Sequence, residues 1–256
     1  MSYPTDLTDK EWSQIRPIVD IQSDIGRPRE VNMREVINGM LYISKTGCQW
    51  NMIPKDFPPK STVFYYFTKF KENGTFIEIN RIVQEKSRVS LGRDKTPTAA
   101  VIDSQTSSSN FICEDTGYDG NKKIVGRKRS IAVDVCGHLL CATVHSAKLS
   151  DPAGSKLLLP ILFSWFSQIQ IIFADGGYSG NPLCDWVKDM FNWILKIIKR
   201  PRHQFKPVKF RWVVERTFSW LINYRRLTRS NEKYASSEEA WIYLSAAHLS
   251  LRRICK

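Results

Sequence analysis

The sequence predicts an α/β protein in which a mixed β-sheet flanked by helices follows an all-helical amino-terminal region. Up to about residue 88, apolar residues recur with helical spacing between capping residues. From Ala99 onwards, short β-rich runs precede alternating helical and strand-like segments. The polar, basic segment between them predicts a linker. We therefore expect a helical domain over residues 1–88, a linker over 89–98 and an α/β domain over 99–256.

The composition indicates a folded protein with a polyanionic partner. The chain has 256 residues, of which 42% are hydrophobic, and its 38 Lys and Arg against 25 Asp and Glu give a net charge of +13. No apolar run approaches the roughly 18 residues of a membrane-spanning helix, and the first residues lack a signal-peptide pattern. We expect nucleic acid as the partner, a cytoplasmic location, and six reduced cysteines.

Four helices are expected in the amino-terminal region. Thr8 and Glu11 form a capping box. The helices are expected to begin at Asp9, after Asn32, at Ser61 or Thr62, and at Thr75, with Gly47 and Gly74 ending the second and third. Four short helices with polar turns predict a compact domain of helix-turn-helix type.

The third helix mixes aromatic and basic side chains. Tyr65 and Lys69, with Tyr66 and Lys71, suit a DNA groove or a phosphate backbone. The alternative is that the helix only contributes Phe64, Phe67 and Phe70 to the core. Both can hold, since these phenylalanines mark one stripe and leave Tyr65 and Lys69 largely outside it.

The carboxyl-terminal region reads as three strands followed by alternating helices and strands. The expected strands are AAVID, RSIAVDV, HLLCATVHS, IQIIFAD and NWILKII, and the expected helices begin near residues 151, 181 and 208. This order predicts a mixed sheet with helices on both faces. Ligands bind such sheets beyond the carboxyl ends of parallel strands, where the topology switches.

Three acidic residues stand in apolar stretches, where a carboxylate is costly unless it is paired or binds metal. Asp103 and Asp175 each end an expected strand, and Glu215 lies on the last expected helix. Oxygen ligands suit Mg²⁺ or Mn²⁺. Two such ions can promote an in-line phosphoryl displacement, so the trio predicts a catalytic metal site that cuts or joins DNA.

Other interpretations of the acidic residues remain open. Asp103 could cap the turn DSQT, Asp175 could start the turn DGG, and Glu215 could pair with Arg211 one helical turn away. Asp134 competes for a place in the site because it also lies in an expected strand. Asp151 is most simply a helix cap before Pro152.

Cysteine and histidine also cluster, which raises the possibility of zinc. The candidate ligands are Cys136, His138, Cys141 and His145. Their spacing fits no standard zinc finger, and the alternating pattern of VDVCGHLLCATV directs some of them to opposite faces. Zinc is therefore not favoured.

Basic residues flank the acidic trio on both sides. They are Lys122, Lys123, Arg127, Lys128 and Arg129 before Asp175, and Arg216, Arg225, Arg226 and Arg229 after Glu215. Most charge runs form a solvated face. Beside an acidic pocket, however, we expect these residues to contact DNA phosphates.

Several motifs occur together in the order and spacing of a known family. They are LTDKEW, GRPRE, TGCQWNMIPKDFPPKSTVFYYF, FADGGYSG, RWVVERTFSWL and YRRL. The chain resembles bacterial insertion-sequence transposases of the DDE type over nearly its whole length. The resemblance implies a ribonuclease-H-like catalytic fold, catalytic and metal-binding roles for Asp103, Asp175 and Glu215, and a homo-oligomeric synaptic complex on nucleoid DNA.

The superfamily pattern Y-x2-R-x3-E-x6-K is matched only in part. Arg211 and Glu215 fit it, which implies DNA contact by Arg211, whereas Val208 and Ile222 replace the tyrosine and the lysine. Basic residues nearby, namely Arg216, Arg225 and Arg226, are expected to substitute for them.

The resemblance implies a DNA transposase that binds the terminal inverted repeats of its element, frees 3′-hydroxyl ends and joins them to target DNA. One alternative is a transposase-derived regulator that binds DNA without chemistry. Another is a nuclease that hydrolyses strands but never joins them.

Overall fold

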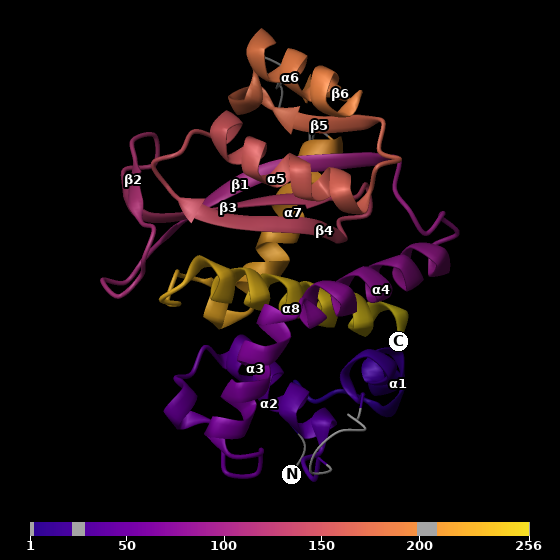
Figure 1. Ribbon diagram of the computed structural model, residues 1–256, viewed down its shortest axis with the longest axis vertical. Coiled ribbons are helices and arrows are strands. Elements are labelled where there is room, and N and C mark those ends of the chain that lie inside the picture. Colours follow the sequence, from indigo (N-terminus) through magenta and orange to yellow (C-terminus); the bar gives the residue numbers. More distant parts are fainter. Residues whose placement is uncertain (1–2, 22–28, 199–208, 256) are drawn as a thin grey trace.

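The computed structural model describes residues 3–21, 29–198 and 209–255, which fold into a helical region and an α/β region (Figure 1). The helical region begins with four α-helices and one short 3-10 helix. They are α1 (Asp9–Val19), α2 (Met33–Thr46), η1 (Trp50–Met52), α3 (Lys60–Glu72) and α4 (Thr75–Ser90).

The expected caps of the first two helices are confirmed. The Thr8 side chain accepts a hydrogen bond from the backbone N–H of Glu11, and the Glu11 carboxylate accepts one from the backbone N–H of Thr8. Asn32 caps α2, and Gly47 ends it with a left-handed φ of 72° that favours glycine. Of the basic turn GRPRE, residues 26–28 lie outside the described residues.

The third helix differs from its expectation at both ends and on one face. It begins at Lys60, ahead of Ser61, and ends at Glu72 with Asn73 as its C-cap. Phe67 and Phe70 are buried, but Phe64 is 49% exposed. Positions six apart on a helix differ by about 120° in direction, so the three phenylalanines could not all face the core.

In the part of the chain that the structure describes, six strands form one mixed sheet. They are β1 (Ala99–Ser108), β2 (Gly117–Asp119), β3 (Ile124–Val133), β4 (Leu139–Ser146), β5 (Ile171–Asp175) and β6 (Ile194–Ile198). Their order is β2-β3-β1-β5-β6, with β4 also paired to β3. β3 is antiparallel to β1 and β4, whereas β1, β5 and β6 are parallel. This is the expected ribonuclease-H-like arrangement, preceded by helices.

Helices cover both faces of the sheet. They are α5 (Asp151–Trp165) and α6 (Asn181–Phe191) on one face, with α7 (Lys209–Ile222) and α8 (Ala235–Ile254) on the other. Figure 1 shows α5 in front of the sheet and α7 behind it. Alternate strand residues divide accordingly: Ile102 and Ile172 pack towards α5, and Val101 and Phe173 pack towards α7.

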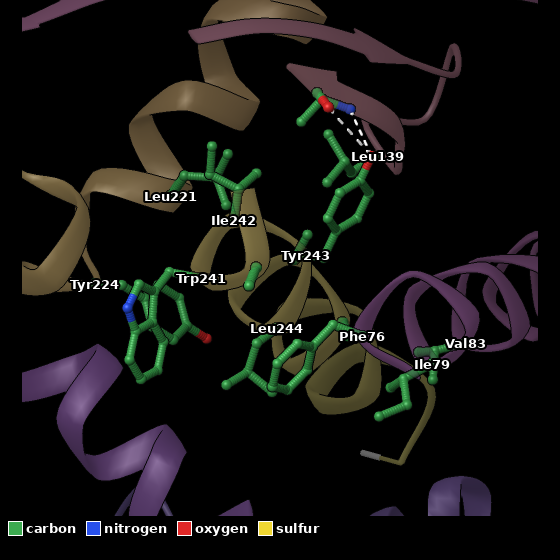
Figure 2. Packing of buried hydrophobic residues seen from close by; sticks show 14 of the residues in the cluster. Phe76, Ile79, Val83, Leu139, Leu221, Tyr224, Trp241, Ile242, Tyr243 and Leu244 are labelled. Atoms are coloured by element: carbon green, nitrogen blue, oxygen red, sulfur yellow. Dashed lines mark hydrogen bonds between the residues drawn. The ribbon is translucent and has the colours of Figure 1, made fainter. Parts of the chain in front are cut away.

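The sequence patterns did not reveal α8, which joins the two regions. It packs along α4, and its Trp241 ring stacks on Phe67 of α3 with centroids 4.3 Å apart. On its other side, the Tyr243 hydroxyl accepts a hydrogen bond from the Ala142 backbone N–H of β4. Figure 2 shows α8 side chains between Phe76 of α4 and Leu139 of the sheet. One apolar cluster therefore extends from the amino-terminal helices to the sheet.

Candidate active site

The register of two parallel strands brings Asp103 and Asp175 together. Val101 of β1 lies opposite Phe173 of β5, so two further residues along each strand place Asp103 beside Asp175. Because side chains alternate along a strand, both carboxylates lie on the face that α7 covers, as Val101 and Phe173 do. The two strands are therefore direct neighbours in the sheet.

Glu215 reaches the same place from α7. Near the start of this helix, Phe210 stacks on Phe173 with ring centroids 4.0 Å apart. The next residue, Arg211, donates a hydrogen bond from Nε to Oε1 of Glu215, one turn further along, at 2.8 Å, and its Nη2 lies 3.5 Å from Asp175 Oδ2. The pairing of Glu215 with Arg211 therefore exists, and it links the glutamate to the strand-end aspartate.

The ionised form of Asp103 is disfavoured, chiefly by burial. Burial raises the pKa of its carboxyl to about 7. The Ser104 backbone N–H, which donates to Asp103 Oδ1 at 2.7 Å, opposes that rise, and nearby Asp175 adds to it. Arg211 lowers the pKa, but only in part. A further positive charge would therefore stabilise ionised Asp103.

Asp151 adjoins this site, contrary to the expectation that it only caps a helix. The cap of α5 is Ser150, whose side chain accepts from the backbone N–H of Ala153. Asp151 is the first residue of the helix, and its Oδ1 accepts hydrogen bonds from Ser104 Oγ at 2.6 Å and from Lys128 Nζ at 3.0 Å. Either residue of Ser150-Asp151 could cap the helix, and the pattern does not choose between them.

The donor set fits a hard divalent cation. The trio offers carboxylate oxygens alone, which suit Mg²⁺ or Mn²⁺ better than zinc. Arg211 pairs with Asp175 and Glu215, and the ligand oxygens of the three carboxylates do not all lie within 4.8 Å of one another. Among the described residues, the only trio of His, Cys, Asp or Glu with ligand atoms all within 4.8 Å of one another is Asp134, Cys136 and His138.

Asp134 joins the loop after β3 to α4 at the other end of the sheet. It follows β3, whose Val133 pairs with Val101 near the start of β1. Asp134 is fully buried, and its carboxylate binds Arg88 of α4, His138 Nδ1 at 3.1 Å and two backbone N–H groups. Burial alone would raise its pKa, but the bonds from His138 and Arg88 lower it to about 2. Asp134 is therefore satisfied without an ion.

The four cysteine and histidine residues considered for zinc do not converge. Cys141 lies in the apolar cluster under α5, and His145 forms a hydrogen bond with Ser130 Oγ. His138 instead contacts Ser87 and Asp134.

Two parts of the chain match known protein families. Residues 94–250 match the family described as "Transposase DDE domain", and residues 7–80 match "Putative transposase of IS4/5 family". The chain belongs to the DDE transposase family. Members of this family generally use a divalent metal.

A curated relative points the same way. The chain is 28% identical over 129 residues to a protein of Burkholderia cepacia described as "Putative transposase for insertion sequence element IS402". The aligned region covers 46% of this chain and 60% of that relative. Within residues 3–21, 29–198 and 209–255 of this DDE family member, no helix is long and apolar enough to cross a membrane.

Part of the expected DNA surface of this family member is buried. Arg127, Lys128 and Arg129 are at most 5% exposed, contrary to the prediction that they contact phosphates. Arg127 donates to three backbone carbonyls and, with Arg129, pairs with Glu238. The reason is the position of β3, which has paired strands on both sides.

Other expected DNA contacts lie at the surface. The exposed ones are Tyr65, Lys69, Lys122, Lys123, Arg225 and Arg229. Arg226 is mostly buried and paired with Glu232, and Arg216 stacks between the rings of Trp212 and Trp220. Val208, which replaces the family tyrosine, lies outside the described residues. Ile222 is exposed at the end of α7.

Proposed function

We propose that the chain is a DNA transposase that binds the terminal inverted repeats of its insertion sequence and catalyses strand cleavage and strand transfer. The observation that carries this proposal is the register of β1 and β5, which sets Asp103 beside Asp175 on the face crossed by the Glu215 helix. Membership of the DDE family supports it.

The three carboxylates are the proposed ligands of the catalytic metal ions. Asp103, Asp175 and Glu215 would together hold Mg²⁺ or Mn²⁺, with two ions in each site. Such ions activate an attacking oxygen and stabilise the leaving oxygen in phosphoryl displacement. Asp103, whose pKa is raised, would lose its proton on binding a cation. Arg211, which pairs with Asp175 and Glu215, would then be available to a DNA phosphate.

Surface charge supports DNA as the substrate. The net charge of +13 favours a polyanion, and exposed lysines lie both on α3 and in the turn before β3. The family resemblance supports a homo-oligomeric synaptic complex on nucleoid DNA in the cytoplasm. The exposed Tyr65 and Lys69 are the candidate contacts of the helical region with the element ends.

A strand-transfer assay tests the proposal. Purified protein is incubated with Mg²⁺ and DNA carrying the element ends, beside Asp103→Asn and Asp175→Asn. Each variant should lose about a hundredfold or more of the cleavage rate, because the ion supplies several kcal/mol of transition-state stabilisation. Asp189→Asn, an exposed acid on α6, is the charge-matched control.

The outcomes separate the alternatives. Equal activity of Asp103→Asn and wild type would remove Asp103 from catalysis. Vigorous cleavage without joined products would identify a nuclease, and specific DNA binding without any cleavage would identify a regulator.

A further inference from the structure

Asp151 approaches the acidic site from the sheet face opposite Glu215. It begins α5, which covers one face of the sheet, whereas Glu215 belongs to α7 on the other face. Ser104, the residue after Asp103, donates its hydroxyl to Asp151 Oδ1, while its backbone N–H donates to Asp103 Oδ1. The two carboxylates thus share one supporting residue.

The two oxygens of Asp151 have different surroundings. Oδ1 accepts from Ser104 and Lys128, whereas Oδ2 faces the space beside Gly177. A Cβ atom built on Gly177 would lie 3.0 Å from Asp175 Oδ1 and 3.3 Å from Asp151 Oδ2. Asp151 Oδ2 and Asp175 Oδ1, which accepts a hydrogen bond from the Gly177 backbone N–H at 2.8 Å, therefore both lie beside the space that a side chain at position 177 would occupy.

Lys128 orients Asp151. Its ammonium is buried, donates to the Leu149 carbonyl at 2.9 Å and pairs with Asp151 Oδ1. Because Lys128 and Ser104 both hold Oδ1, the carboxylate cannot turn freely, and Oδ2 remains directed at the site.

From this geometry we infer that Asp151 is a fourth carboxylate of the metal site and supplies Oδ2 to a divalent cation held jointly with Asp175. The inference rests on the proposed function, since it assigns a further ligand to the same site. It also gives a role to the small residue at position 177, because a larger side chain there would enter the space between the carboxylates.

The test measures Mn²⁺ binding to the full chain without DNA, by electron paramagnetic resonance of the free ion. Asp151→Asn keeps an oxygen that can accept from Ser104 and Lys128 and replaces only the charge and Oδ2. It should weaken Mn²⁺ binding at least about tenfold, the lower end of the loss when a group supporting a metal site is removed. Asp151→Glu, which keeps the carboxylate, should bind more tightly than Asp151→Asn.

Gly177→Ala provides a second variant with no change of charge. Its methyl group enters the shared space, so it should also weaken Mn²⁺ binding. Asp189→Asn is the control for charge, and circular dichroism verifies that each variant is folded.

The results distinguish this inference from the proposed function. If Asp103→Asn abolishes Mn²⁺ binding while Asp151→Asn and Gly177→Ala titrate as wild type does, Asp151 is not a ligand and the proposed function stands. If Asp103→Asn does not remove a Mn²⁺ site that wild type has, or if wild type has no such site, both the Asp151 inference and the proposed function are wrong.

Discussion

Arg211 Nη2 on α7 lies 3.5 Å from Asp175 Oδ2 at the end of β5. The same guanidinium donates to Glu215, so one cation joins the helix to the sheet edge. Both partners are partly exposed, so this pairing contributes little to stability. Its importance is electrostatic, because it offsets the mutual repulsion of the carboxylates at the site.

Replacing Arg211 by Gln should shift the pH at which the site takes up a cation. Arg211 lowers the pKa of Asp103, so its removal raises that pKa further. The midpoint of Mn²⁺ binding against pH should therefore move to higher pH. Arg216→Gln, which removes a cation held between two tryptophans, is the control. An unchanged midpoint for Arg211→Gln would contradict the assignment.

Stability without metal should depend on the ionisation of Asp103. The folded protein holds the Asp103 proton up to about pH 7, whereas the ordinary pKa of an aspartate is 3.8. Asp103 therefore makes its whole contribution to the free energy of unfolding below pH 3.8. That contribution is lost as pH rises through about 7. In chelator at pH 8, Asp103→Asn should be more stable than wild type, by up to about 4 kcal/mol.

Urea unfolding at several pH values between 5 and 8 measures this difference. Glu239 also has a raised pKa, so wild type and variant are compared at each pH. The advantage of Asp103→Asn should shrink as pH falls. An advantage independent of pH would disprove the electrostatic explanation.

The buried ion pairs of β3 should be costly to break. Glu238 of α8 pairs with Arg127 and Arg129 and accepts the Ser230 hydroxyl. Glu238→Ala leaves two buried guanidinium groups without this partner, so unfolding free energy should fall by about 3–5 kcal/mol. Urea denaturation checks this, with Glu72→Ala at an exposed helical position as the control. A loss below that of the control would contradict the prediction.

DNA binding through α3 should show in its salt dependence. Lys69 is exposed, and a lysine that contacts one phosphate releases about one counterion. Lys69→Ala should weaken binding to the element ends and reduce the slope of log K against log salt by about 1. Fluorescence anisotropy at several salt concentrations measures both. Lys188→Ala on α6 removes the same charge elsewhere, and an equal effect there would mean that α3 makes no specific contact.

Strong local patterns predicted most of the fold. The capping box at Thr8, the strands carrying Asp103 and Asp175, and the helix carrying Glu215 each follow from neighbouring residues. The expected end of the first strand at Asp103 was wrong, because β1 continues to Ser108 through its pairing with β3. The sequence failed where burial depends on distant partners. Arg127 and Arg129 form a charged run typical of a surface, and only their pairing with Glu238, more than a hundred residues away, allows their burial.

Helix α8 was missed for a related reason. Most of residues 240–251 are buried, including small and polar ones such as Ser245 and His248, so the helix shows no apolar stripe. Asp151 posed a different problem, since its role depends on Ser104 and Lys128, which the chain brings to it only on folding.

The intercalation of α8 among the amino-terminal helices constrains the biosynthesis of this protein. A ribosome makes α1 to α4 first, but Phe67 and Phe76 lie in a core that also contains Trp241 and Leu244. These early helices cannot bury that surface until residues 235–254 have emerged. A prematurely terminated chain therefore exposes an aromatic surface to chaperones and proteases, and only completed copies acquire a stable amino-terminal half.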